Sequence, residues 1–358
     1  MNPRYKLAIC AVISLLAGCA SNKITTINNL NADGASLKQG RYINRYPGNK
    51  TYPYSCEENC YPPTNDIHCE SDMEQCQYRG KNPKLTTHSG YQIHWLGHAS
   101  FEIKTPSGKR FLFDPVFGEF DWPVNWAFQM ANGFERQSPK SKVQNLSDID
   151  AVLYSHLHYD HFNKHDIALI GNKPKYLVPL NFATHFDRNH YTIHEMDWFT
   201  THLVAQTKVH FVPAHHFNSR IWVPFLYNDD NQALWGGWVL EENGKTLFFA
   251  GDTGYSNHFK DIQRQYGDID VCLLPIASYF HQEYETWYRY VHTRPEDAIA
   301  AANDLNCKVT IPWGYGNASW QMGDHSSHSA LFRLLHTLKI IETDSQFYIM
   351  NEGERLFL

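Results

Sequence analysis

Three imidazoles and one carboxylate stand within six residues of this chain, and this run constrains the fold more than any other feature. The run reads His156-Leu157-His158-Tyr159-Asp160-His161, and it follows the mostly apolar segment 149–154, which predicts a buried strand. A strand that ends in such a loop can aim these side chains at one or two metal ions. Neutral imidazole and carboxylate suit zinc, and mixed shells of this kind suit catalysis better than structure. A polar surface loop is the alternative, which the density of ligands disfavours.

Short apolar runs recur from about Tyr91 onward and predict many strands. They occupy residues 91–95, 101–103, 111–113, 151–154, 176–178, 209–212, 234–240, 247–250, 271–274 and 309–311. Helices are predicted at 257–266, 295–305 and 329–341, where an amphipathic pattern or an opening Pro with acidic residues is present. Strands first, and then strands alternating with helices, favour two packed sheets with helices outside.

A two-metal centre needs ligands from several strand ends, because one loop cannot complete two ligand shells. His215 and His216 follow the predicted strand at 209–212. Asp252 follows the predicted strand at 247–250 and lies between Gly251 and Gly254. Glycine permits the tight turn and the close backbone approach that such a site requires.

The ordered series of these motifs resembles the metallo-β-lactamase superfamily over about residues 91–316. Its motifs here are Gly97-His98-Ala99-Ser100, Phe113-Asp114-Pro115, the His-x-His-x-Asp-His run, the downstream histidine and Ala250-Gly251-Asp252-Thr253-Gly254. Within the superfamily, the chain is similar to N-acylphosphatidylethanolamine-hydrolysing phospholipases D, in the blocks 234–238, 248–255, 274–279, 292–298 and 312–314. The resemblance implies an α+β fold, the αβ/βα four-layer sandwich.

The resemblance also implies two zinc ions and a set of ligands for them. The implied ligands of the first zinc are His156, His158 and His216, with His215 as the alternative to His216. The implied ligands of the second are Asp160 and His161, with Asp252 as the bridging carboxylate. By the same resemblance, His98 and Asp114 hold the ligand loops and His292 lies near the substrate.

Pro312 departs from the pattern of the family. The family places a histidine ligand of the second zinc just before the Trp-Gly of the last motif, and proline cannot bind zinc. Three alternatives remain open: His325 or His328 replaces it, water fills the position, or only one metal binds tightly.

The implied activity is phospholipase D-type hydrolysis of N-acylphosphatidylethanolamine or a related phospholipid by a metal-bound hydroxide. Asp160 and Asp252 would offset the charge of the metals and orient the hydroxide, and His292 would protonate the leaving group or bind the phosphate. Two alternatives stay open. One is another hydrolase on this fold, acting on a lactone, a thioester or a β-lactam, and the other is a non-catalytic zinc-binding envelope protein.

The first eighteen residues predict a lipoprotein signal peptide. Arg4 and Lys6 precede a short apolar segment, residues 7–16, and Leu16-Ala17-Gly18-Cys19 resembles a lipobox. This resemblance implies a lipid anchor at Cys19 in the bacterial cell envelope, at the outer membrane facing the periplasm. An ordinary secretory signal with a chance cysteine is the alternative. The net charge of −6 gives no reason to expect a nucleic acid partner. The phospholipase resemblance implies a homodimer, without an interface signature in the sequence.

The remaining cysteines fall into two groups. Cys56, Cys60, Cys69 and Cys76 cluster in a region of little periodicity, where two disulfides are predicted and a four-thiolate zinc site is the alternative. Residues 19–88 are therefore predicted as a tether and disulfide-tied extension outside the hydrolase domain at 89–358. Cys272 and Cys307 stand alone in apolar segments and are predicted as buried, inert thiols.

Overall fold

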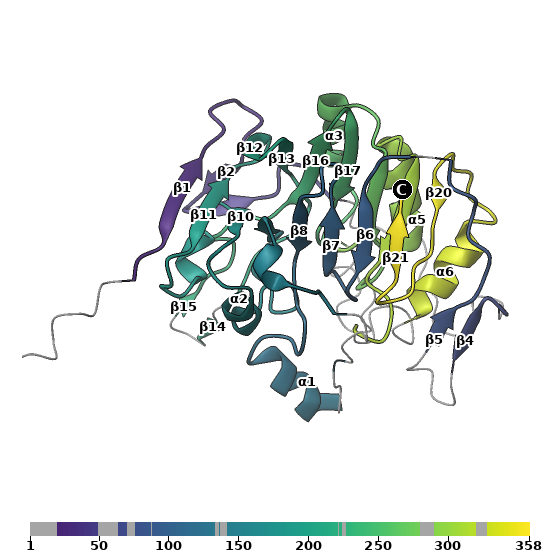
Figure 1. Ribbon diagram of the computed structural model, residues 1–358, viewed down its shortest axis with the longest axis horizontal. Helices are drawn as coiled ribbons and strands as arrows, with labels where there is room; N and C mark the ends of the chain where they lie inside the picture. The colour runs from purple at the N-terminus through teal and green to yellow at the C-terminus, as the bar shows by residue number, and fades with distance from the viewer. Residues whose placement is uncertain are drawn as a thin grey trace, which may run out of the picture.

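Two sheets pack face to face with helices outside them, as the sequence predicts (Figure 1). The computed structural model describes residues 20–48, 64–69, 76–86, 88–132, 136, 142–220, 222–223, 227–279, 290–319 and 328–358. One large cluster of buried side chains draws on strands of both sheets and forms the core. The α+β class and the layered sandwich are therefore confirmed.

The first sheet has eight strands and the second has seven. The first runs in the order β1 (Lys23–Ile27), β11 (Thr192–Met196), β10 (Lys175–Pro179), β9 (Ala151–Leu153), β8 (Arg110–Phe113), β7 (Phe101–Lys104), β6 (Gln92–Trp95) and β21 (Arg355–Phe357). The second runs in the order β12 (Thr200–Val204), β13 (Thr207–Val212), β16 (Gly237–Glu242), β17 (Lys245–Phe249), β18 (Val271–Pro275), β19 (Val309–Trp313) and β20 (Gln346–Phe347). Three small hairpins are formed by β2 (Ser36–Lys38) with β3 (Arg41–Ile43), β4 (Ile67–Cys69) with β5 (Cys76–Tyr78), and β14 (Trp222–Val223) with β15 (Tyr227–Asn228).

The period of two along a strand explains how the first sheet is covered on both faces. On β8, Phe111 and Phe113 enter the core between the sheets, whereas Leu112 belongs to a second apolar cluster on the opposite face. Helix α2 (Lys164–Ile170) contributes Ile167 and Ile170 to that second cluster. Because both faces are buried, β8 reads as a continuous apolar run in the sequence.

Helix α5 (Pro295–Asp304) packs against β18 of the second sheet. It also contacts α3 (His258–Tyr266) and α6 (Ser329–Thr337). All three predicted helices are confirmed, although α6 ends four residues before the predicted boundary. Further helical segments are α1 (Val124–Asn132) and the 3-10 turns η1 (Leu146–Asp148) and η2 (Ala183–His185). Among the described residues, no helix combines the length and apolarity needed to cross a membrane.

The described part of the N-terminal segment packs on the two sheets instead of standing apart from them as a tether. Strand β1 pairs in parallel with β11 along its whole length and forms the left edge of the first sheet in Figure 1. Tyr42, Ile67 and Cys76 are buried in the main core. Without β1, the backbone of β11 would present an unpaired edge, so this segment completes the sheet. The described parts of residues 19–88 are thus packed on the hydrolase domain.

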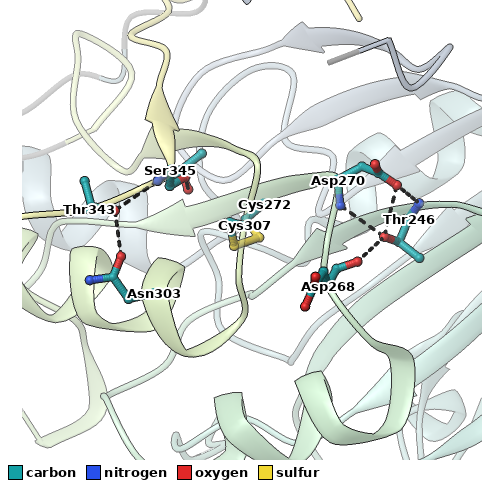
Figure 2. The surroundings of a disulfide bond; sticks show 9 residues. Thr246, Asp268, Asp270, Cys272, Asn303, Cys307, Thr343 and Ser345 are labelled. Carbon is teal, nitrogen blue, oxygen red and sulfur yellow. Dashed lines mark hydrogen bonds between the residues drawn. A yellow bond between two sulfur atoms is a disulfide. The ribbon is translucent and has the colours of Figure 1, made fainter. Parts of the chain in front are cut away.

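The structure contains two disulfides among its described cysteines. Cys69 and Cys76 are bonded within the β4–β5 hairpin, which confirms one predicted bridge and excludes a zinc site built from all four thiolates. Cys272 on β18 is bonded to Cys307, which lies between α5 and β19 (Figure 2). The prediction of two inert thiols was wrong, because neighbouring parallel strands bring these cysteines to a Cα–Cα distance of 6.0 Å. The predicted signal peptide at 1–18, the anchor at Cys19, and Cys56 and Cys60 lie outside the described residues.

Candidate metal centre

Three histidine nitrogens converge at the edge where β9 and β13 end. The Nε2 atom of His156 lies 2.9 Å from Nδ1 of His158, and that Nδ1 atom lies 3.3 Å from Nε2 of His216. Four ligands held tetrahedrally at the usual Zn–N distance would stand about 3.3 Å apart. The three nitrogens are therefore spaced as ligands of a single ion, as the sequence predicts for the first metal.

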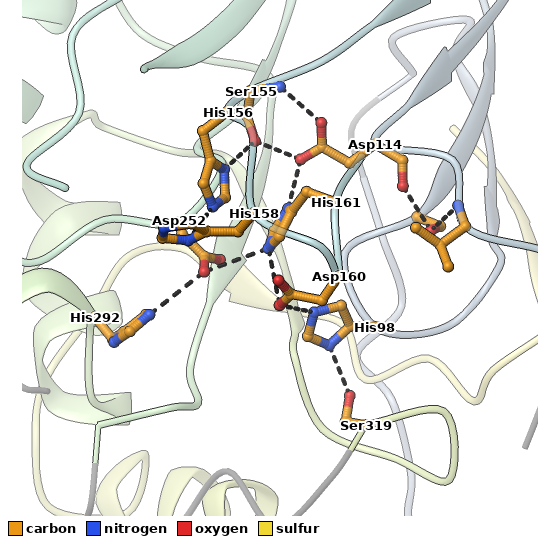
Figure 3. A network of polar contacts seen from close by, with 12 residues as sticks. His98, Asp114, Ser155, His156, His158, Asp160, His161, Asp252, His292 and Ser319 are labelled. Carbon is orange, nitrogen blue, oxygen red and sulfur yellow. Dashed lines mark hydrogen bonds and ion pairs between the residues drawn. The ribbon is translucent and has the colours of Figure 1, made fainter. Parts of the chain in front are cut away.

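A second group adjoins the first, around His161. The Nδ1 atom of His161 contacts Oδ2 of Asp114 at 2.8 Å, while its Nε2 atom faces the Oδ2 atoms of Asp160 and Asp252 at 3.4 and 3.3 Å (Figure 3). This Nε2 atom is buried and makes no hydrogen bond. Although burial opposes the charged form, Asp252 and Asp160 raise the pKa of His161 well above its usual value, so a proton on this ring supplies the positive charge when no metal is bound. A metal ion could replace that proton between the same three atoms, so these residues fit a metal.

Asp252 stands between the two groups. Its Oδ2 atom lies 3.3 Å from Nε2 of His161 and 4.0 Å from Nε2 of His216, which is the placement of a bridging carboxylate. The Nε2 atom of His292 lies 3.4 Å from the same oxygen, so the predicted substrate histidine also reaches the centre (Figure 3). The structure thus brings together all six predicted ligands and His292.

The glycines beside Asp252 allow the two sheets to approach at this point. Gly251 has a φ of +62°, and a Cβ atom there would lie 2.8 Å from Cβ of Ser155. A Cβ atom on Gly254 would lie 2.1 Å from the carbonyl oxygen of Tyr290. Any side chain at either position would push the Asp252 loop away from the ligands, so these two glycines permit the close approach that the sequence predicts.

Burial and charge set the protonation of the centre. Desolvation lowers the pKa of His156 and His216 well below the usual value, and lowers that of His158 to about 4. Burial opposes the charged forms of Asp160 and Asp252, yet attraction to His161 holds the pKa of both carboxyl groups well below their usual range. The first group is therefore neutral and open to a cation at neutral pH, and the second carries negative charge.

Arg220 holds the ligand loop, a role that the sequence reasoning missed. Its Nη1 atom donates to the carbonyl oxygens of Leu157 and Phe162 at 2.9 Å, and its guanidinium lies over the ring of Tyr159. Asn218 accepts a hydrogen bond from the backbone N–H of Leu157 at 2.8 Å. The only signal was that Asn218 and Arg220 closely follow His216 in the sequence.

Asn44 holds the backbone of His216 from the N-terminal segment. Its Nδ2 atom donates to the carbonyl oxygen of His216 at 2.8 Å, and its Oδ1 atom accepts from the N–H of His216 at 3.1 Å. The carbonyl oxygen of Val291 lies 2.9 Å from Nδ1 of His216, so the Nε2 atom is the one turned to the centre. Nothing in the sequence near Asn44 indicates this role.

Other candidate ligands lie elsewhere. The ring of His215 packs on Tyr290, and its Nδ1 atom contacts the carbonyl oxygen of that residue at 2.9 Å. Pro312 pairs with Leu274 in the second sheet. His328 is buried at the start of α6 and hydrogen-bonds to the backbone of Cys76. The other proposed replacement, His325, lies outside the described residues.

Comparisons with known proteins agree with this geometry. The sequence model of the Beta-lactamase superfamily domain matches residues 109–315. An N-acyl-phosphatidylethanolamine-hydrolyzing phospholipase D of Caenorhabditis elegans is 27% identical over 287 residues, which are 74% of this chain and 75% of that enzyme. An uncharacterised protein of Mycobacterium tuberculosis is 30% identical over 272 residues, which are 72% of this chain and 65% of that protein. The chain thus spans less than two thirds of the length of this mycobacterial relative.

A solved structure of similar fold is that of a possible metal-dependent hydrolase from Veillonella parvula. It superposes with a TM-score of 0.55 at 14% identity, over 75% of this chain and 99% of that chain. This likeness concerns the fold alone. Together with the family match and the converging His and Asp side chains, it is consistent with a metal-dependent hydrolase.

Proposed function

The chain belongs to the metallo-β-lactamase superfamily, and from this premise we propose that it is a zinc-dependent phosphodiesterase of the phospholipase D type. The proposed substrate is N-acylphosphatidylethanolamine or a related phospholipid, which hydrolysis would convert to phosphatidic acid and an N-acylated alcohol. One observation carries the proposal: Asp252 lies between three histidines on one side and the Asp160–His161 pair on the other.

The donor set supports zinc as the metal. His156, His158 and His216 would hold one ion, Asp160 and His161 the other, and Asp252 both. Imidazole nitrogen with carboxylate oxygen is a ligand combination that zinc accepts, whereas magnesium and calcium prefer oxygen alone. When bound, a pair of such ions lowers the pKa of water to about 7 and stabilises negative charge on phosphoryl oxygens.

The protein groups around the centre have separate roles in this reaction. The carboxylates of Asp160 and Asp252, whose pKa values lie well below their usual range, would offset half of the charge of two zinc ions. The side chain of His292 is 11% exposed, whereas those of His161 and His216 are fully buried. Because it is the more accessible imidazole, His292 would meet the substrate and donate a proton to the alcohol oxygen as the phosphorus–oxygen bond breaks.

The substrate class is supported by similarity rather than by the metal ligands. The match to the nematode phospholipase D extends over 74% of this chain, far beyond the ligand loops. The two disulfides support export to an oxidising compartment. We therefore place the enzyme in the bacterial envelope, anchored through Cys19 to the outer membrane on its periplasmic side, where phospholipid is available.

The test is an assay on vesicles that contain N-acylphosphatidylethanolamine, with chain that begins at residue 20 and is loaded with zinc. Release of phosphatidic acid is expected, and Asp252→Asn should abolish it. Asp150→Asn is the matched control, because Asp150 is a carboxylate that binds Lys109 and the backbone of Arg110 away from the centre. Turnover of lactones or thioesters without any phosphodiester cleavage would overturn the proposal.

A further inference from the structure

We propose that His98 is a metal ligand, and that its Nε2 atom completes the second metal site together with Asp160, His161 and Asp252. The Nε2 atom lies 2.9 Å from Oδ2 of Asp160, and one ligand atom each from His98, Asp160 and His161 falls within 4.8 Å of the others. The inference rests on the metal dependence in the proposed function, and not on the identity of the substrate.

The contact between His161 and Asp114 shows where the second ion would lie. Asp114 accepts a hydrogen bond from Nδ1 of His161 at 2.8 Å, so a neutral ring carries its lone pair on Nε2. That lone pair faces two carboxylate oxygens, of Asp160 and Asp252, at 3.4 and 3.3 Å. A positive charge must stand between these atoms: a proton on Nε2 supplies it in the ion-free protein, and a metal ion would supply it when bound. His98 borders the same space (Figure 3).

His98 is held in the manner of a ligating histidine. Its Nδ1 atom contacts Oγ of Ser319 at 3.0 Å, which leaves Nε2 directed at the Asp160 carboxylate. Ligating histidines usually bind such an outer partner through the other ring nitrogen, because this fixes the tautomer and the ring orientation. The residue is 1% exposed, so only a group inside the protein can use that Nε2 atom.

The backbone at His98 is strained to reach this position. His98 has a φ of +50° and follows Gly97, which has a φ of +90°, in the loop after β6. A non-glycine residue in the left-handed region persists where the surrounding structure requires it, and such residues cluster at functional sites. Pro312 offers no ligand nitrogen at the end of β19, so the imidazole comes from the first sheet instead.

A second role for His98 makes the opposite demand on its protons. If His98 only oriented Asp160, Nε2 would carry the proton and donate it to the carboxylate, and Nδ1 would accept from Ser319. As a ligand, His98 must carry its proton on Nδ1 and donate it to Ser319. If His98 is a ligand, removing Nε2 takes one ligand from the second metal site. If His98 only orients Asp160, removing Nε2 takes away one hydrogen bond and leaves every ligand of that site in place.

The experiment measures zinc bound per chain after equilibrium dialysis, by mass spectrometry of the metal. Two zinc ions are expected for the wild type and one for His98→Asn, whose amide keeps a polar group near Ser319. His94→Asn is the matched control, because His94 is a buried histidine of β6 that pairs with Glu102 at 3.1 Å. It should retain two. Two tightly bound zinc ions in a folded His98→Asn variant, or only one in the wild type, would overturn the assignment.

A second variant decides the matter if His98→Asn does not fold. Ser319→Ala leaves the imidazole in place but removes its outer partner, so the second zinc should bind about 10–100-fold more weakly while the first is unchanged. If this variant bound the second zinc as tightly as the wild type does, the ligand role of His98 would be refuted. Two zinc ions without phospholipid turnover would instead sink the proposed function and leave the assignment of His98 standing.

Discussion

The carboxylate of Asp114 lies 2.8 Å from Nδ1 of His161, and this contact decides which ring nitrogen faces the metal centre. The same carboxylate accepts the backbone N–H of Ser155 at 2.7 Å. Asp114 follows β8 and Ser155 follows β9, so one buried side chain joins two strand ends and a metal-binding ring. Orientation of the ligands is therefore built into the first sheet.

Replacing Asp114 should weaken metal binding without removing a ligand. Asp114→Asn replaces the carboxylate that accepts from His161 with an uncharged amide, and mutation of such an outer partner typically costs 10–100-fold in metal affinity. Competition against a zinc chelator measures the effect. Asp150→Asn changes a carboxylate at the opposite end of β9 from the ligand loop, so this variant should bind zinc as the wild type does. Equal affinities in the two variants would show that the His161 ring is held by other contacts.

The N-terminal segment should contribute to metal affinity through Asn44. Asn44→Ala removes two hydrogen bonds to the backbone of His216, each of which stabilises the fold by about 1 kcal/mol. We expect weaker zinc binding at the first site, measured by titration with a chelator as competitor.

Asn22→Ala is the matched control for this variant. Asn22 also uses its side chain to donate to and accept from the backbone, since it donates to Asp187 and accepts from Asn189 and Tyr191. It lies directly before β1, and none of these partners is a predicted metal ligand. Zinc affinity that falls equally in both variants would indicate general loosening of the N-terminal segment instead of a local effect on His216.

Replacing His292 should affect turnover and leave the metal content intact. For His292→Gln we expect a fall in kcat of about 10²–10⁴-fold, the usual range for loss of a general acid. Two zinc ions should remain bound. A fall in zinc content would contradict this and make His292 a ligand, because its Nε2 atom lies only 3.4 Å from Oδ2 of Asp252.

The Cys272–Cys307 disulfide should stabilise the second sheet. It closes a loop with a sequence separation of 35, for which the chain-entropy model predicts about 4 kcal/mol at most. Urea unfolding of the variant that carries both Cys272→Ala and Cys307→Ala should show a loss of about 2–4 kcal/mol. The wild type in reducing agent should lose at least this amount, because reduction also breaks the Cys69–Cys76 bond. Unchanged stability of the reduced wild type would mean that the bond adds nothing to packing of α5 on β18.

Glu352 should make stability depend on pH. Burial raises the pKa of Glu352 to about 7 from 4.5, although the N–H groups of Asn317 and Ala318 donate to its carboxylate. A raised carboxyl pKa means that the folded state binds a proton more tightly than the unfolded chain. This contribution is complete below pH 4.5 and is lost as the pH rises through 7.

The loss should be about 1–2 kcal/mol, since Glu352 is partly exposed to solvent. Unfolding in urea at pH 5 and pH 8 measures it, and Glu352→Gln should remove this part of the pH dependence. Identical pH dependence in the two proteins would rule out Glu352 as its source. Glu352 also supports the loop that carries Ser319, so the variant tests a contact close to the second site.

Short-range patterns in the sequence predicted the parts of the fold that follow local rules. Strand β8 was visible because both of its faces are apolar, and α5 because Pro295 and acidic residues open it. Strand β11 was missed, since it contains His194 and Glu195 and lacks a run of apolar residues. Strand β1 also lacks a run of apolar residues, and four of its five residues are exposed, so it was missed as well.

The sequence by itself determined the chemistry of the centre. The identity and order of its histidines and aspartates, the glycines around Asp252 and the absence of a ligand at Pro312 are all properties of the chain. The tertiary structure alone decided which groups support them. The supporting residues Asn44, Arg220 and Ser319 lie in loops that are far apart in the sequence. Cys272 meets Cys307 only because β18 and β19 are neighbours in the sheet. The physical reason is that a hydrogen bond or a disulfide depends on distances of a few ångströms, whereas a sequence pattern records only separation along the chain.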